Sequence, residues 1–335
     1  MLTIKDGRIK EYIKYHKDSN DIKDIDPSYE MLEYICTRFE LNIEQRYWLA
    51  FLYSTNYNAA TVYYIYNEFP DYAGVNIGRM QRWWDANKDK LDFQTDCRWI
   101  RSRNQFVGIV EEYMKLCGNS QEKTYKKLVG YNTPIDGYIE CYDFFKQIPW
   151  FGRFRLFLLL EAVHVVTGLN IEPDGLPLDE AESSRNGLCF ALGRDDLLTG
   201  HDYGRNHITN AELSWLGKKY NELIVLMRHL FPDGRIDAWN VETTLCAYKK
   251  WHRGKRWPGY YIARQGKEIQ SMSMKVKDGV CWDVLWNFRT ETYPPHLLGE
   301  ITGNDNDGAV WKKVGKGKIS AFLHSGKGIR GFLDE

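Results

Sequence analysis

The sequence predicts a mainly α-helical fold for this chain of 335 residues. Apolar residues recur three and four positions apart in successive segments, which is the period of a helix with one buried face. Asn, Ser, Thr and Asp stand where helix N-caps are expected, and Pro and Gly separate the segments. With 15% aromatic residues, a chain of this length can bury a large core.

Helices are predicted first between residues 27 and 117. One begins at Pro27, and Asn42 is expected to cap the next in a capping box with Gln45. A break at Tyr57-Asn58 precedes a third helix. Further helices are expected over residues 76–90 and from an Asp96 cap to Cys117. A turn at residues 118–120 and the stretch over residues 130–137 are expected to form a linker-like region.

Two helices around a Pro-Gly turn are predicted for residues 145–168. The second is almost wholly apolar apart from Glu161 and His164. The first N–H groups of a helix and its dipole attract phosphate. We therefore expect the turn to bind DNA through five residues: Trp150, Phe151, Gly152, Arg153 and Arg155.

The remaining chain is expected to contain a polar loop from residue 174, a helix over residues 211–231 capped by Thr209 or Asn210, and a helix over residues 241–251. Glycine becomes frequent beyond residue 300, which predicts an irregular tail. The chain is accordingly divided into an N-terminal helical region (1–130), a hairpin-containing catalytic region (131–300) and a Gly-rich tail (301–335).

Composition and missing motifs exclude several classes of protein. The formal net charge is zero, so DNA binding would need a local basic stripe. Seven scattered cysteines without C-x-x-C spacing indicate a reducing compartment. No apolar run could form a signal peptide or membrane span, so a cytoplasmic protein without a membrane partner is expected. Phosphate-loop, Rossmann, H-E-x-x-H, G-x-S-x-G and deaminase signatures are absent.

Glu161 and His164 lie three positions apart on one face of the apolar helix. Burial raises the pKa of a carboxyl group, and a raised carboxylate is suited to act as a general base. We therefore take both residues as catalytic candidates. The alternative is a buried Glu–His pair that only orders the core.

Residues 145–174 resemble the helix-hairpin-helix DNA glycosylases. Ile148-Pro149-Trp150-Phe151-Gly152 matches the family's L-P-G-x-G hairpin except at Trp150, where the family has glycine. The family carries a catalytic aspartate in a later Pro-Asp segment, which implies a catalytic role for Asp174. Its neighbours Pro173 and Gly175 also suit an ordinary turn. No lysine lies between the hairpin and Asp174, which argues against a glycosylase-lyase.

Anion-binding candidates follow the hairpin. Ser183–Gly187 and Gly193–Asp196 mix small residues with arginine and carboxylates, and such loops can cradle phosphate or hold Mg²⁺ through adjacent aspartates. The helix at 241–251 aligns Glu242, Cys246 and Lys249 on one stripe. Ordinary surface turns and an exposed basic helix end would have the same sequence features. The expected diphosphate ligands are Arg185, Arg194 and Lys249.

The sequence also resembles the phage amino acid:DNA transferases, the α-glutamyl/putrescinyl thymine pyrophosphorylases, which are related to these glycosylases. The resemblance rests on residues 151–161, 184–187 and 241–261. It implies that an amino acid or polyamine amine displaces diphosphate from diphosphorylated 5-hydroxymethyluracil in double-stranded DNA, in the cytoplasm of the host.

In this reading, Glu161 or Asp174 accepts the proton of the amine, and the diphosphate-binding cations stabilise the leaving group. The alternatives are a helix-hairpin-helix DNA glycosylase, in which Asp174 acts on the glycosidic bond, and a non-catalytic phage DNA-binding protein.

Overall fold

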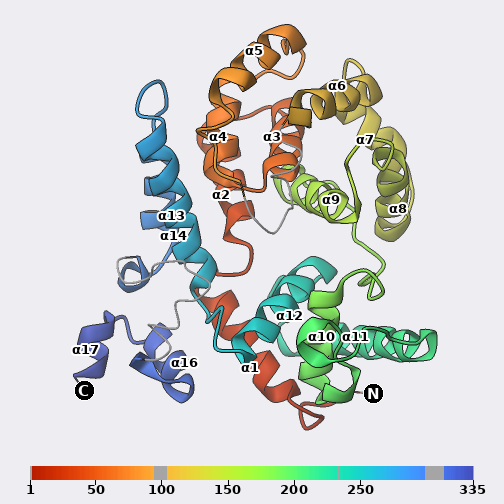
Figure 1. The fold of residues 1–335 in the computed structure, drawn as a ribbon, viewed down its shortest axis with the longest axis vertical. Coiled ribbons are helices and arrows are strands. Elements are labelled where there is room, and N and C mark those ends of the chain that lie inside the picture. Colours follow the sequence, from red (N-terminus) through yellow and green to blue (C-terminus); the bar gives the residue numbers. More distant parts are fainter. Residues whose placement is uncertain (1, 94–103, 233, 299–312, 335) are drawn as a thin grey trace. The chain divides into compact units, whose positions relative to one another are not determined.

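The computed structural model describes residues 2–93, 104–232, 234–298 and 313–334 (Figure 1). Within these ranges the regular secondary structure is helical, and the only β pairing is an isolated bridge between Gly200 and Arg205. The prediction of a mainly α fold is therefore confirmed.

The chain forms two compact units, each assembled from separated stretches. Unit 1 contains Met1–Pro27, Pro173–Arg264 and Thr292–Glu335, and unit 2 contains Ser28–Glu172 and Gln265–Glu291. This grouping follows spatial contacts rather than sequence ranges, so the three sequence regions predicted above stay a prediction.

Unit 2 holds most of the helices that precede residue 168. They are α2 (Pro27–Arg38), α3 (Ile43–Asn56), α4 (Ala59–Glu68), α5 (Ile77–Asn87), α6 (Phe106–Cys117), α7 (Gln121–Val129), α8 (Pro134–Phe145) and α9 (Arg153–Thr167), joined by most of α13 (Tyr260–Lys275) and by α14 (Asp283–Thr292). The capping box of Asn42 with Gln45 is confirmed, and so is the break at Tyr57. The Asp96 cap lies outside the described residues.

The turn predicted at residues 118–120 is confirmed, and residues 130–133 are irregular, but the linker predicted over residues 130–137 is wrong from Pro134 onward, where α8 begins. Helix α7, between these two parts, was not predicted. Helix α7 has nine residues, too few for a clear apolar period. A distant side chain supports its N-terminus: the Glu44 carboxylate accepts the N–H groups of Gln121 (2.9 Å) and Glu122 (3.2 Å). Such capping across the chain satisfies helix N–H groups without leaving a local sequence signal.

Stacked aromatic rings fill the core of unit 2. The ring centroids of Phe51 and Tyr113 are 3.8 Å apart, and Phe51 also stacks on Phe151 of the predicted hairpin at 6.0 Å. Helix α9 packs along α3, where Arg46 donates a hydrogen bond to the Val166 carbonyl at 3.0 Å (Figure 1). The hairpin is therefore anchored to the core through Phe151 and α9.

Unit 1 is built around the contact of α10 with α12. Its helices are α1 (Ile9–Asp21), α10 (Glu182–Leu192), α11 (Asn210–Leu230), α12 (Ala238–His252), α16 (Ile319–Leu323) and α17 (Ile329–Leu333), with short 3₁₀ turns at Asp195–Leu197, His201–Tyr203, Pro295–Leu297 and Lys316–Lys318. Of the two predicted caps of α11, Thr209 is the one observed, and it forms a capping box with Glu212.

The polar loop predicted over residues 174–185 is wrong from Glu182 onward, where α10 begins. The loop predicted over Ser183–Gly187 is wrong as well, because Gly187 lies inside this helix. A Cβ atom at Gly187 would lie 2.0 Å from the carbonyl oxygen of Leu245 in α12. Glycine is therefore needed here for close helix packing, and its sequence signal is the same as that of a turn.

Helix α13 was also missed, because its N-terminus depends on a residue far away in the sequence. The buried Asp24 carboxylate accepts the N–H groups of Gly259 (2.7 Å) and Ile262 (2.8 Å). The contact satisfies the first donors of α13 and ties the N-terminal segment of the chain to it.

Candidate functional site

The predicted hairpin forms, and its backbone is unusual at Trp150. This residue has φ of 67° and leaves 64% of its surface exposed. Positive φ is the region that favours glycine, the residue that the glycosylase hairpin has at this position. Trp150 therefore holds a backbone conformation that glycine adopts more readily, at a cost of about 1–2 kcal/mol. Gly152 then leads into α9 as its N-cap residue.

The five residues predicted to bind DNA divide into two groups. Trp150 and Gly152 are exposed and Arg153 is half-buried. Phe151 and Arg155 are buried, and Arg155 donates a hydrogen bond to the Trp150 carbonyl at 3.2 Å. The first group can meet a ligand, whereas Phe151 and Arg155 hold the turn in place.

Glu161 is buried within α9 at 1% exposure. Tyr138 of α8 is its electrostatic neighbour: the pKa of the Tyr138 phenol is raised mainly by burial, with Tyr142 and Glu161 adding to the rise and Arg153 opposing it. A carboxylate, a phenol and a guanidinium therefore interact at the start of the hairpin unit. The guanidinium stays protonated, and the raised pKa of Tyr138 keeps the phenol protonated, so Glu161 is the proton-acceptor candidate of the three.

His164 and Asp174 are placed differently from Glu161. His164 is half-buried and its Nδ1 forms a hydrogen bond with the Leu169 carbonyl at 2.8 Å. Asp174 is exposed in a turn where the Gly175 N–H donates to the Pro173 carbonyl at 2.8 Å. Asp174 belongs to unit 1 and Glu161 to unit 2, so the two carboxylate candidates are held by different compact units.

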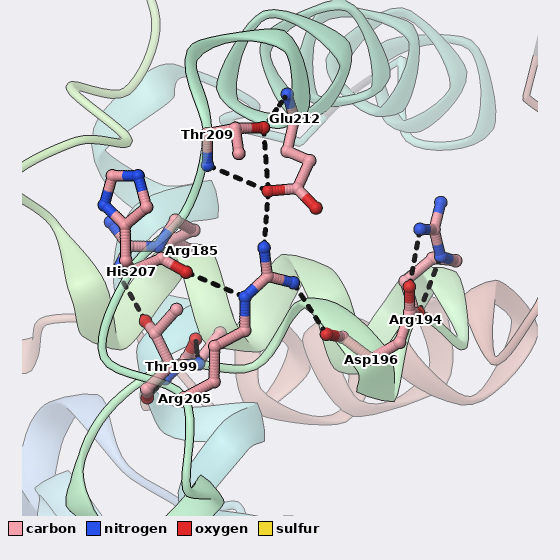
Figure 2. A network of polar contacts seen from close by, with 9 residues as sticks. Arg185, Arg194, Asp196, Thr199, Arg205, His207, Thr209 and Glu212 are labelled. Carbon is pink, nitrogen blue, oxygen red and sulfur yellow. Dashed lines mark hydrogen bonds and ion pairs between the residues drawn. The ribbon is translucent and has the colours of Figure 1, made fainter.

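The two predicted phosphate-binding arginines donate their hydrogen bonds to oxygen atoms of the protein itself (Figure 2). Arg185 is 5% exposed and donates to the Leu178 carbonyl (2.5 Å) and to Thr199 Oγ1 (2.6 Å). Arg194 forms a bidentate pair with Asp196, both N–O distances being 2.7 Å. A third guanidinium in the same view, that of Arg205, donates hydrogen bonds to both the Asp196 carbonyl and the Glu212 carboxylate.

Lys249, the third predicted cation, is half-buried on α12. Its pKa is lowered mainly by burial and further by Lys250 and Arg253, while Cys246 and Glu182 oppose the change. The lysine therefore lies in a partly desolvated place where an anionic group would stabilise its charge.

Sequence reasoning missed a polar cluster that forms on α12. Asp26 accepts a hydrogen bond from Thr243 Oγ1 at 2.6 Å, Ser184 Oγ donates to Glu242 at 2.6 Å, and Ser183 Oγ lies 3.1 Å from Cys246 Sγ. We call the following residues the α12 polar cluster: Asp26, Ser183, Ser184, Glu242, Thr243, Cys246 and Lys249. The stripe of Glu242, Cys246 and Lys249 was visible in the sequence, but its partners were not.

An arginine–tyrosine pair adjoins this cluster. Arg256 is 4% exposed, donates to the Tyr261 hydroxyl at 2.6 Å and lies 5.3 Å from the Tyr261 ring centroid. Tyr261 interacts electrostatically with both Cys246 and Asp26. Arg256 and Asp26 have φ of 45° and 47°. Strained backbone of this kind persists where the surroundings impose it, often at functional sites.

The adjacent aspartates expected to suit Mg²⁺ each pair with an arginine. Asp195 binds Arg8 at 2.7 Å, and Asp196 binds Arg194. Among the described residues, no group of three or more His, Cys, Asp or Glu side chains could hold a metal ion. Nor does any helix in that part of the chain have the length and apolarity needed to cross a membrane.

Comparison with known proteins identifies the family. The family model described as amino acid:DNA transferase matches residues 20–256. A protein named serinyltransferase from Salmonella phage ViI is 29% identical over 309 residues, which cover 87% of this chain and 73% of the relative. No solved structure matches the chain. The chain belongs to the amino acid:DNA transferase family, whose members are transferases that modify DNA with an amino acid.

Proposed function

We propose that this transferase modifies a diphosphorylated 5-hydroxymethyluracil base in DNA, replacing diphosphate with an amino acid. The observation that carries the proposal is the family match over residues 20–256, which includes both the hairpin and the α12 polar cluster. The phage relative named serinyltransferase favours an amino acid over a polyamine as the co-substrate.

The reaction is a displacement at the exocyclic methylene carbon of the base. The amine nitrogen attacks this carbon, the carbon–oxygen bond breaks, and diphosphate leaves with the electron pair. The amine is protonated at neutral pH, so a base must first take its proton. We assign this role to Glu161, because it is the carboxylate buried in α9, the helix that follows the hairpin.

The hairpin is proposed to grip double-stranded DNA. A base must leave the stack before chemistry can occur on it, and the exposed indole of Trp150 is placed to wedge or stack there. Arg153 would contact a phosphate beside the N-terminus of α9. His164 would position Glu161 from the same helix.

Of the two arginines proposed to meet the diphosphate, Arg194 is the better placed. Its pair with Asp196 is largely exposed, and exchanging an exposed ion pair for a phosphate costs little. Arg185 is buried among carbonyl oxygens, and releasing it would leave these acceptors unsatisfied.

The test is mass spectrometry of nucleosides after incubation of the protein with diphosphorylated 5-hydroxymethyluracil DNA and single amino acids. A heavier nucleoside together with released diphosphate supports transfer. A free base would instead show glycosylase action, and an unchanged substrate with every amino acid and polyamine would contradict the proposal.

Serine sharpens this test because it carries both an amine and a hydroxyl group. Attachment through nitrogen or oxygen gives products of equal mass, but only the oxygen-linked product keeps a primary amine. A reagent specific for primary amines, applied to the purified nucleoside, therefore distinguishes the two nucleophiles. A product that reacts with this reagent would contradict the amine as the attacking group.

A further inference from the structure

Three segments that are far apart in the sequence meet on one side of α12. Asp26 comes from the N-terminal stretch, Ser183 and Ser184 from the first turn of α10, and Thr243 and Cys246 from α12 itself. All of them belong to unit 1. The Gly187–Leu245 contact lets α10 approach α12 closely enough for these side chains to meet.

The cluster is held firmly rather than being a chance surface group. Asp26 has a left-handed backbone, and Asp24, two residues earlier, is anchored to the N–H groups of Gly259 and Ile262. Strain of this size persists only where the surrounding contacts impose it. The position of the Asp26 carboxylate is therefore fixed on both sides, by Asp24 and by Thr243.

The cluster carries both signs of charge. Asp26 and Glu242 supply carboxylates, and Lys249, two helical turns after Glu242, supplies an ammonium group beside Cys246. A diphosphate would be attracted to Lys249 but repelled by the two carboxylates. A zwitterion with one ammonium and one carboxylate complements both ends of the cluster.

We propose that the α12 polar cluster takes up the amino-acid co-substrate as a zwitterion before reaction, with Asp26 holding its α-ammonium group and Lys249 its α-carboxylate. The proposal rests on the proposed function and assigns the co-substrate to unit 1. In it, Lys249 binds the amino acid instead of the diphosphate that the sequence suggested.

The pH dependence of binding follows from the surroundings of Asp26. The charged and titratable groups that face it are Asp24, Arg235, Asp237, Glu242 and Tyr261. Burial raises the pKa of Asp26 to about 7, with Glu242 adding to the rise and the Thr243 hydrogen bond opposing it. Because an ammonium group binds the carboxylate and not the acid, affinity should rise as pH increases through 7.

The experiment is calorimetric titration of the full chain, without DNA, using L-serine, putrescine and inorganic diphosphate as probes. We expect serine to bind. Asp26→Asn and Lys249→Met should each weaken serine binding at least tenfold, and Asp26→Asn should also remove the pH dependence. Asp278→Asn and Lys277→Met, which change exposed residues of unit 2, are the matched controls and should bind serine normally.

Thr243→Ala is a second, milder variant should Asp26→Asn fail to fold; it should shift the pH profile of serine binding and keep the helical circular dichroism signal. The assignment would be overturned if serine bound undiminished both to Lys249→Met and to the Asp26 variant, or to Thr243→Ala in its place. So would diphosphate that competes with serine for the cluster. Serine binding without any heavier nucleoside would contradict the proposed function while leaving this site intact.

Discussion

The hairpin of unit 2 and the α12 polar cluster of unit 1 are built in opposite ways. The hairpin is one continuous stretch whose geometry is set by its own residues, Trp150 to Arg155, and by an aromatic core under Phe151. The cluster joins side chains from Asp26, α10 and α12, and its charged members are half-buried. A local motif can therefore supply a DNA grip, whereas a mixed-charge site requires distant segments to fold together.

The largest expected effect tests whether the chemistry belongs to the hairpin unit. Glu161→Gln keeps the shape of the side chain but removes the proton acceptor. Turnover in the nucleoside assay should fall about 10²-fold or more, while DNA affinity and helix content stay unchanged.

Asp174→Asn is the matched carboxylate control for this variant. Its side chain is exposed in a turn, so its loss should cost little activity. Near-normal transfer by Glu161→Gln, with activity lost in Asp174→Asn, would show that the proton acceptor is Asp174 of unit 1 and not a residue of the hairpin unit.

The second prediction concerns the packing that creates the α12 polar cluster. Gly187→Ala would place a methyl group against the Leu245 carbonyl, which is backbone and cannot rotate away. We expect a loss of about 3 kcal/mol in the free energy of unfolding, measured by urea titration. Serine binding should weaken with it, because α10 must move away from α12.

Gly217→Ala in α11 is the control, since nothing lies within 4 Å of the added Cβ. It should stabilise the protein by about 0.5–1 kcal/mol through helix propensity. A Gly187→Ala variant as stable as Gly217→Ala would show that α10 and α12 do not pack as described.

The third prediction separates the two arginines of the hairpin. Arg153→Ala should weaken DNA binding and reduce the slope of log affinity against log salt by about 1, with little loss of stability. Arg155→Ala should mainly destabilise the turn, because it removes a buried donor to the Trp150 carbonyl. Equal salt slopes for Arg153→Ala and the unaltered protein would exclude a phosphate contact at Arg153.

The smallest effect is expected for Trp150→Gly. Relief of the left-handed backbone should stabilise the fold by about 1 kcal/mol, because the exposed indole contributes little packing. DNA affinity should fall if the indole meets a base. Thermal unfolding and DNA titration of the same variant separate these two effects, and a variant that is less stable would show that Trp150 has a packing role.

The sequence predicted the helices that combine a local cap with a long apolar period. Asn42 and Thr209 stand next to the helices they cap, and the sequence indicated both, Thr209 as one of two alternatives. Helix α7 has a local cap in Ser120 but only nine residues, and Glu44 supports its start from a distance. The start of α13 is supported by Asp24, which no window of neighbouring residues contains.

In the candidate site, too, features set by neighbouring residues could be predicted and contacts between distant residues could not. The apolar period around Glu161 predicted its burial, which the structure confirms. The stripe of Glu242, Cys246 and Lys249 was recognised on its helix, but Asp26 stood alone in the sequence. Only folding brings Asp26 to Thr243, and only the α10–α12 contact brings the two serines to that stripe.

The Asp24 contact has a practical consequence for dividing this protein into fragments. A piece that matches the family model, residues 20–256, keeps Asp24 but removes the Gly259 and Ile262 N–H groups. A piece starting after Pro27 leaves those donors and removes the carboxylate. The first truncation leaves the Asp24 carboxylate without its donors, and the second leaves the two N–H groups without their acceptor. Shortened versions for crystallisation or labelling should therefore retain residues 24 to 262 as one continuous span.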